Sequence, residues 1–355
     1  MKVGILTLYY ADNYGAMLQA YALHRHIQNN GAEAYFVPYI PANEQRAYSI
    51  DPLKGYGAKD KLRRVMQLGV RMDNYRAFRA FRENCIPVGN GNDNPDVVIV
   101  GSDQVWNEKI VDDIAPYMLD WVPETCKKAS YAASCGTAEV SEATLAAMRT
   151  HLPSFTAVSV REQATAQVLA GIGIHAEAVA DPVFLLPADA WTQIESVPDG
   201  ITADKGFVLL YLLRRDNAAA AAAVEYAERH GQRLYVIHPM GAKMTDCGTL
   251  LNGVGPREFV WLIHHAGAVF SNSFHAASFS VIFEKPLCTF ANGNLGGRVS
   301  NLLGYVERRE MDSGIIVPMA DSPELCALIE HSKEFIDNIL KRGRAFRVMH
   351  GVPGR

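Results

Sequence analysis

Long apolar runs, paired cysteines and a secretion signal are all missing from this sequence of 355 residues. Its longest apolar runs, such as 207–213, are far shorter than the about 20 residues that cross a bilayer, so no transmembrane helix is predicted. The first residues do not have the layout of a signal peptide. The six cysteines form no C-x-x-C pair and no Cys/His zinc spacing, so we predict reduced packing residues and no metal site. These absences favour a cytoplasmic protein.

The sequence also lacks a large excess of charge of one sign. With 34 basic and 38 acidic residues its formal net charge is −4, so general attraction to nucleic acid is not expected. Apolar residues make up 49% and charged residues 20%, which is ordinary for a globular protein. The length is enough for about two domains of roughly 150 residues each.

Short apolar runs rich in β-forming residues alternate with helical patterns, which indicates an α/β fold with mainly parallel sheets. A first series of strands is predicted over 2–8, 34–39, 96–100, 129–133, 157–160 and 176–179, with helices over 15–29, 141–151 and 161–169. A second series has strands over 207–213, 233–237, 268–271 and 287–290, with helices over 218–230, 256–265 and 274–283.

Prolines and a glycine among polar residues in 186–206 indicate a connection between two domains. We therefore predict an N-terminal domain over 1–186 and a C-terminal domain over 207–320. Apolar residues at helical spacing predict that 321–355 contains a helix that packs back on the N-terminal domain.

Residues 41–85 interrupt the first series and carry a local excess of basic side chains. The segment holds ten Lys and Arg against five Asp and Glu, and its apolar residues recur at helical spacing. We predict a helical insertion with a basic face. The favoured interpretation is a solvated cover over one domain; the alternative is a site for an anionic, lipid-linked acceptor, with peripheral contact to the inner face of a membrane.

Polar and aromatic side chains follow two predicted strands of the first domain. Asn13 lies between the first strand and a helix start, where backbone N–H groups often meet an anion. Asp103, Gln104 and Trp106 follow the strand 96–100, a combination typical of sugar sites. Equally, Asn13 can be a helix cap, Trp106 can be core packing and Asp103 can be a turn residue.

Charged side chains occupy similar positions further along. Arg161 joins a strand to a helix, where its planar fork can bind a carboxylate or phosphate, or form an ordinary surface ion pair. For Asp181, which follows a strand, we favour a structural role. His275 lies at a helix start, where an imidazole that titrates near neutrality can exchange protons with a substrate or simply pack. Lys285 and Arg298 follow and can face the same crevice.

Taken in order, these residues lie in motifs that resemble the polysaccharide pyruvyltransferase family. The motifs are D-N-Y-G-A-M-L-Q-A-Y-A-L, V-G-S-D-Q-V-W-N, S-Y-A-A-S, S-V-R-E, D-P-V-F-L-L, N-S-F-H-A-A-S-F-S-V-I-F-E-K-P and R-V-S-N-L-L. They extend over about residues 1–305 and are specific as a set.

The resemblance implies two Rossmann-like domains that face a central cleft, similar to the GT-B architecture of glycosyltransferases. It also implies the transfer of pyruvate from phosphoenolpyruvate to a sugar of a surface-polysaccharide precursor as a ketal, with release of phosphate. No cofactor is expected. Phosphoenolpyruvate is the co-substrate, and a glycan or lipid-linked oligosaccharide is the acceptor.

The same resemblance implies that His275 is the candidate general acid and Arg161 the candidate grip on the anionic groups of the donor. Chemistry and position, rather than motif matches, add Lys285 and Arg298 as supporting charges on the donor side, in the C-terminal domain. On the acceptor side, in the N-terminal domain, the same reasoning makes Asp103 the candidate base or hydroxyl ligand. The sugar pocket would be shaped by Asn13, Gln104 and Trp106.

One position departs from the family pattern. Many members resemble R-L-H at the histidine motif, whereas Ser273 stands two residues before His275 here. Ser273 would then lie on the donor side, and either Lys285, Arg298 or Arg214-Arg215 supplies the missing charge or the donor is not phosphoenolpyruvate. The alternatives are a GT-B-type glycosyltransferase that uses a nucleotide sugar and a non-catalytic carbohydrate-binding protein.

Overall fold

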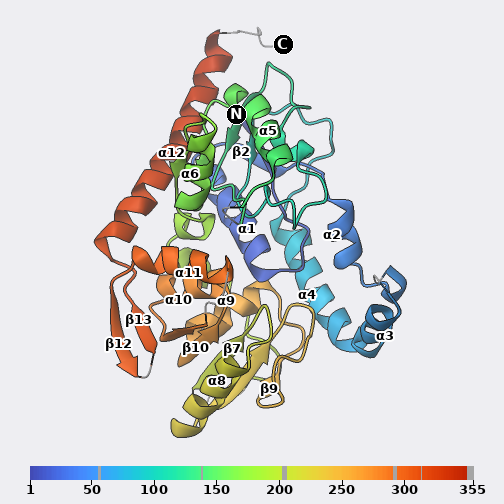
Figure 1. Cartoon of the computed structure of the whole chain (residues 1–355), viewed down its shortest axis with the longest axis vertical. Coiled ribbons are helices and arrows are strands. Elements are labelled where there is room, and N and C mark those ends of the chain that lie inside the picture. Colours follow the sequence, from blue (N-terminus) through green and yellow to red (C-terminus); the bar gives the residue numbers. More distant parts are fainter. Residues whose placement is uncertain (55–56, 137–138, 202–205, 291–293, 313, 350–355) are drawn as a thin grey trace.

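The computed structural model describes residues 1–54, 57–136, 139–201, 206–290, 294–312 and 314–349 (Figure 1). Its first half contains a parallel sheet in the order β2-β1-β3-β4. These strands are β1 (Lys2–Leu6), β2 (Glu33–Phe36), β3 (Val97–Val100) and β4 (Lys127–Ser130). All four residues of β3 are buried apolar side chains, as expected for a parallel strand covered on both faces.

A short parallel pair continues from the edge of this sheet. It consists of β5 (Ser159–Val160) and β6 (Glu177–Ala178), and single bridges join it to the β4 side. The connections carry α1 (Tyr14–Asn29), α5 (Glu142–His151), α6 (Gln163–Gly171) and the short 3-10 helices η2 (Ala115–Met118), η3 (Leu152–Ser154) and η4 (Pro182–Leu185). The short helix α7 (Ala188–Thr192) then leads to the second half.

The second half contains a seven-stranded sheet in the order β12-β13-β11-β10-β7-β8-β9. Its strands are β7 (Phe207–Tyr211), β8 (Arg233–Ile237), β9 (Thr249–Leu250), β10 (Ala268–Ser271), β11 (Leu287–Thr289), β12 (Arg308–Asp312) and β13 (Ile315–Pro318). Its helices are α8 (Asn217–Arg229), α9 (Pro256–His265), α10 (Phe274–Ile282) and α11 (Asn294–Gly304). The predicted α/β fold with two Rossmann-like units is thus confirmed.

Three strands of the second sheet had not been predicted. β12 and β13 form an antiparallel edge, and β12 has the sequence R-R-E-M-D, with no buried residue. β9 has only two residues. β12 and β9 are the two edges of the sheet, and an exposed edge strand does not need the apolar run by which buried strands are detected in a sequence. This reason does not apply to β13, which is apolar and lies between β11 and β12.

The halves share an apolar core that includes residues of both sheets. At its centre the Tyr14 ring of α1 stacks between Phe78 of α4 (Leu68–Cys85) and Phe259 of α9, with centroid distances of 5.0 and 4.6 Å. The Tyr14 hydroxyl donates a hydrogen bond of 3.2 Å to the carbonyl of Val254. The start of α1 is therefore held against the second half.

Residues 41–85 form α2 (Ala42–Ala47), η1 (Pro52–Lys54), α3 (Ala58–Met66) and α4. Most of the described basic side chains of this segment are exposed, but three arginines turn inward: Arg64 and Arg71 are buried, and Arg82 forms an ion pair with Asp12. Within the described chain, no helix is both long and apolar enough to span a membrane.

The last helix, α12 (Pro323–Met349), starts beside the second half and runs along the first, past α6 (Figure 1). Ser332 Oγ accepts a hydrogen bond of 2.8 Å from the N–H of Ala180, just after β6. The Phe335 ring contacts Tyr131, with centroids 6.3 Å apart. α12 therefore covers the β4 to β6 side of the first half.

Candidate active site

Three ionisable side chains from different elements meet between the two halves. Arg161 follows β5, Asp181 follows β6, and His275 lies in the first turn of α10. Arg161 Nη1 donates a hydrogen bond of 2.9 Å to Asp181 Oδ2, and His275 Nε2 lies 3.6 Å from the same oxygen. All three side chains are buried. The first half thus contributes a guanidinium and a carboxylate, and the second half contributes an imidazole.

Carboxylates surround the Arg161 guanidinium. Its Nε donates a hydrogen bond of 3.1 Å to Glu162 Oε1, and Nη1 lies 3.7 Å from Asp103 Oδ1. Burial alone would lower the pKa of Arg161, but the surrounding carboxylates raise it above its ordinary value. Burial also opposes ionisation of Asp181, yet His275 and Arg161 bring its pKa down to about 2. Arg161 Nη2 has no hydrogen-bond partner among the described residues, which leaves one edge of the fork for a ligand.

A glycine lets the His275 ring pack directly on the start of α1. A Cβ built at Gly15 would lie 1.9 Å from His275 Nδ1, so no side chain fits there while the ring keeps its place. Ser273 caps α10 by accepting a hydrogen bond from the N–H of Ala276, which fixes the turn that carries His275. Within the described chain, His275 Nε2 makes no hydrogen bond and can serve a ligand.

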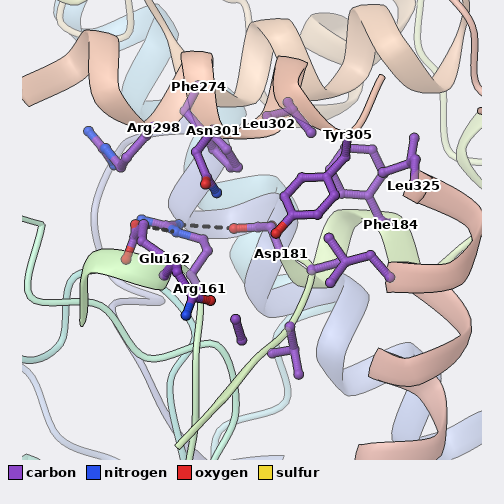
Figure 2. Close-up of a pocket in the computed structure, with 15 residues that line it drawn as sticks. Arg161, Glu162, Asp181, Phe184, Phe274, Arg298, Asn301, Leu302, Tyr305 and Leu325 are labelled. Carbon is purple, nitrogen blue, oxygen red and sulfur yellow. Dashed lines mark hydrogen bonds and ion pairs between the residues drawn. The ribbon is translucent and has the colours of Figure 1, made fainter. Parts of the chain in front are cut away.

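A second guanidinium, that of Arg298 on α11, lines a pocket whose wall also contains Arg161 and Asp181. Figure 2 shows Arg298 and Asn301 on one side and Arg161, Glu162 and Asp181 on the other. Burial, followed by the like charge of Arg161, lowers the pKa of Arg298. No carboxylate among the described residues forms an ion pair with Arg298, and its Nε lacks a hydrogen-bond partner there. Arg298 is therefore the cation of the pocket that is least compensated.

Apolar side chains form the rest of the pocket wall. They include Phe184, Phe274, Leu302, Tyr305, Leu325 and Leu328. The cavity volume is about 30 Å³, which exceeds what a single buried water requires.

The backbone of Asp103 aims its carboxylate at Arg161. Asp103 has φ of 73°, in the left-handed region that costs a non-glycine residue free energy and that often occurs at functional sites. A bridge to Ala133 continues the β3 side of the sheet at this residue. Next to it, Ser102 Oγ is buried and has no hydrogen-bond partner among the residues described.

The other residues predicted for the sugar side have protein partners. Asn13 caps α1, as the helix-cap alternative predicted, by accepting a hydrogen bond of 3.2 Å from a backbone N–H. Gln104 Oε1 accepts one of 2.8 Å from Asn107 Nδ2. Trp106 is 1% exposed, and its Nε1 donates to a backbone carbonyl at 3.3 Å. The Trp106 ring therefore belongs to the core and offers no free face to a sugar.

Two further buried carboxyl groups, those of Glu44 and Asp12, had not been predicted as site residues. Burial, with the nearby Asp103 charge as the next cause, raises the pKa of Glu44 on α2 to about 8. Burial also raises the pKa of Asp12 to about 6, although Arg82 lies 2.6 Å away and opposes the shift. Glu44 lies in the insertion, whose pattern indicates helices but not which polar side chain turns inward.

Lys285 lies away from the Arg161 group. It follows the C-terminal end of α10, whereas His275 is at the N-terminal end. Burial lowers the pKa of Lys285, and the nearby Glu195 partly opposes this shift.

Glu195 also contacts two histidines. It accepts hydrogen bonds from His264 Nδ1 at 2.7 Å and His265 Nε2 at 3.3 Å. The potential ligand atoms of these three residues lie within 4.8 Å of one another, a geometry that could hold a metal ion.

Comparison with known proteins gives one match by sequence. The family model described as polysaccharide pyruvyl transferase matches residues 13–294, which contain Arg161, Asp181 and His275. Arg298 and the other lining residues of α11 and α12 follow the end of the match. No curated protein matches the sequence.

Solved structures align over nearly the whole chain at low identity. UDP-GlcNAc 2-epimerase from Methanocaldococcus jannaschii is 12% identical with a TM-score of 0.48, and the alignment covers 96% of this chain and 100% of that one. The corresponding epimerase from Rickettsia bellii is 10% identical with a TM-score of 0.47 and 98% coverage of both chains. The glycosyltransferase SnogD from Streptomyces nogalater is 11% identical with a TM-score of 0.40, covering 98% and 99%.

Proposed function

The chain belongs to the polysaccharide pyruvyl transferase family, and from this premise we propose that it transfers pyruvate from phosphoenolpyruvate to a glycan as a ketal. The observation that supports this best is that Arg161 and Arg298, one from each half, line a single pocket, and that His275 lies 3.6 Å from Asp181 in the wall of that pocket. Arg161, Arg298 and His275 each have a nitrogen with no hydrogen-bond partner among the described residues. These are the groups that a small phosphorylated acid requires: cations for its anions and an imidazole for its enol.

The two guanidinium groups have different parts in binding the donor. Arg161 is held by Asp181 and Glu162, so it presents Nη2 in a fixed direction but contributes little net positive charge. Arg298 has no such carboxylate partner in the described chain, so it supplies the uncompensated charge for the donor's phosphate or carboxylate. This arrangement provides a charge on the donor side without the arginine that many family members have at position 273.

His275 is the proposed general acid. A proton from Nε2 passes to the methylene carbon of the enol, and the ionised Asp181, 3.6 Å away, is an anionic partner for the protonated ring. The first sugar hydroxyl then attacks the adjacent carbon and loses its proton to Asp103. The second hydroxyl displaces phosphate. One hydroxyl proton thus replaces the proton used to form the new methyl group, and the other leaves with phosphate.

The proposal is tested by phosphate release with phosphoenolpyruvate and a panel of free and lipid-linked glycans, with nucleotide sugars run in parallel. We expect phosphate release, together with a product whose mass increases by a pyruvyl ketal. His275→Ala should lose at least about 10²-fold in rate, the usual contribution of a general acid. His331→Ala, which removes an exposed histidine of α12, is the control. Release of a nucleoside diphosphate instead would make the chain a glycosyltransferase.

Two variants separate the roles of the arginines in the same assay. Arg161→Lys should lose much of kcat/KM because one ammonium cannot replace the bonds from Nε and Nη1 and the free Nη2. Arg298→Gln should raise KM for phosphoenolpyruvate more than it lowers kcat, since it removes donor charge. A near-wild-type rate for Arg161→Lys would remove Arg161 from the proposed site.

A further inference from the structure

Helix α3 turns its apolar side away from the protein. Leu62, Val65 and Met66 are spaced by three and four residues, so they share one helix face, and they are 62%, 54% and 79% exposed. Leu53, in the 3-10 turn before the helix, is 74% exposed. Four of the ten large apolar side chains that are exposed in the described chain therefore fall within 53–66.

The opposite face of α3 is polar and points inward. Arg64 is buried, and its Nε donates a hydrogen bond of 2.9 Å to Asp60. Its Nη1 and Nη2 donate to the carbonyls of Ser49 and Ala47 at 3.2 and 3.3 Å. A helix that covers a water-soluble core normally buries its apolar stripe and exposes its arginines. Packing within this chain therefore does not account for the outer face of α3.

Exposed lysines surround this apolar face. Lys54, Lys59 and Lys61 are all exposed. The nearby acid, Asp60, is engaged by Arg64 on the inner side. Figure 1 shows α3 projecting at the margin of the molecule, beyond α4 and far from α12. The outer face thus combines apolar side chains in the middle with positive charge around them.

We propose that α3 and the turn before it form a surface that binds an anionic lipid bilayer. Apolar side chains of a helix lying in the plane of a bilayer enter the boundary between headgroups and acyl chains, while lysines contact the lipid phosphates. A second copy of the same face fits less well, because its lysines would meet lysines of like charge. Lipid binding by α3 is independent of the proposed reaction and can be measured without donor or acceptor.

The test is cosedimentation of the full chain with vesicles of phosphatidylcholine alone or with added phosphatidylglycerol. We expect binding to the anionic vesicles to exceed binding to the neutral ones by at least tenfold, and to weaken at 1 M salt, where the screening length falls to about 3 Å. Equal binding to both kinds of vesicle, or binding to neither, would overturn the proposal.

Matched variants assign the binding to α3. The triple change Leu62→Ser, Val65→Ser and Met66→Ser should reduce binding to anionic vesicles at least tenfold. The control is Val197→Ser, Met311→Ser and Met319→Ser, three exposed apolar residues elsewhere, which should bind as wild type. The lipid assignment is wrong if the α3 variant still binds vesicles as wild type does. It is also wrong if light scattering shows that wild type is a dimer and that the α3 variant is a monomer, because α3 would then bind a second copy of the chain.

Discussion

Among single residues, Gly15 constrains the position of the His275 ring most tightly, because it has no side chain. Gly15 allows the His275 ring to lie against α1, and a Cβ there would meet three ring atoms at 1.9, 2.4 and 2.5 Å. We predict that Gly15→Ala moves the ring and lowers kcat by about 10²-fold, because displacing a catalytic group by about 1 Å has effects of that size. Steady-state kinetics with phosphoenolpyruvate measures the loss.

Gly69→Ala is the control for this substitution. Gly69 lies in α4, and no atom lies within 4 Å of the Cβ that would be added. The helix there should tolerate alanine or gain stability from it. A Gly15→Ala enzyme with wild-type kcat would show that the position of His275 against α1 does not matter for the reaction.

Glu44 gives a prediction for pH dependence. Its pKa in the folded state is about 8, well above the ordinary value for glutamate, so the folded protein holds a proton that the unfolded chain releases at lower pH. Between these two values the group lowers stability as pH rises. Glu44→Gln removes this loss of stability. The free energy of unfolding of the variant minus that of wild type should therefore be larger at pH 8.5 than at pH 5, by at least about 2 kcal/mol.

Urea unfolding at the two pH values measures this difference. Glu330→Gln changes an exposed glutamate of α12 and serves as the reference substitution. A Glu44→Gln effect that is the same at both pH values would mean that Glu44 is already ionised in the folded protein at pH 5.

The sequence predicted part of this residue-level arrangement. Arg161, Asp103 and His275 were identified because each lies at a strand end or helix start within a motif. Asp181 was given a structural role, and it does cap η4, but its second oxygen also joins Arg161 and approaches His275. Lys285 has the right charge, but a whole helix separates it from His275, and spacing along the chain does not report that distance.

At the scale of elements, α4 joins the two halves. Asn74 is 1% exposed, and its Nδ2 donates to the carbonyls of His238 and Pro239 at 3.0 and 3.1 Å. Its Oδ1 accepts a hydrogen bond of 2.8 Å from the N–H of Gly253. We predict that Asn74→Ala lowers the free energy of unfolding by about 3 kcal/mol, because buried backbone groups of the second half lose their partners.

Asn84→Ala is the matched control on the same helix. Asn84 is exposed, and its Nδ2 donates only within α4, to the carbonyl of Ala80. Its replacement should change the free energy of unfolding by about 0.5 kcal/mol or less. Equal effects of the two substitutions in urea unfolding would show that α4 does not hold the halves together.

Elements that lie inside the sheets could be predicted, and those at the margins could not. β3 and β7 are runs of buried apolar residues, and β10 is such a run up to its last residue, Ser271, which makes them recognisable without a structure. β12 carries charge on most of its residues and is placed by pairing with β13 rather than by burial. The helices of 41–85 were predicted, whereas the outward orientation of the apolar face of α3 follows only from the contacts of Arg64.

At the scale of the whole molecule, one apolar core extends from the first sheet to the second. It includes Val3 and Ile99 of the first sheet and Leu209 and Val269 of the second, with Tyr14 between them. Because these side chains are buried together, neither half keeps a complete core when the other unfolds. We predict a single thermal unfolding transition by calorimetry. Two resolved transitions would show that the halves fold as independent units.

The course of α12 has a consequence for how the protein is made. The ribosome releases this helix after both sheets, yet Ser332 and Phe335 cover residues of the first half that were synthesised long before. Until then Tyr131 and its neighbours lack the cover that α12 provides. The first half can therefore be completed only after the whole second half, which lies between it and α12 in the chain, has been synthesised.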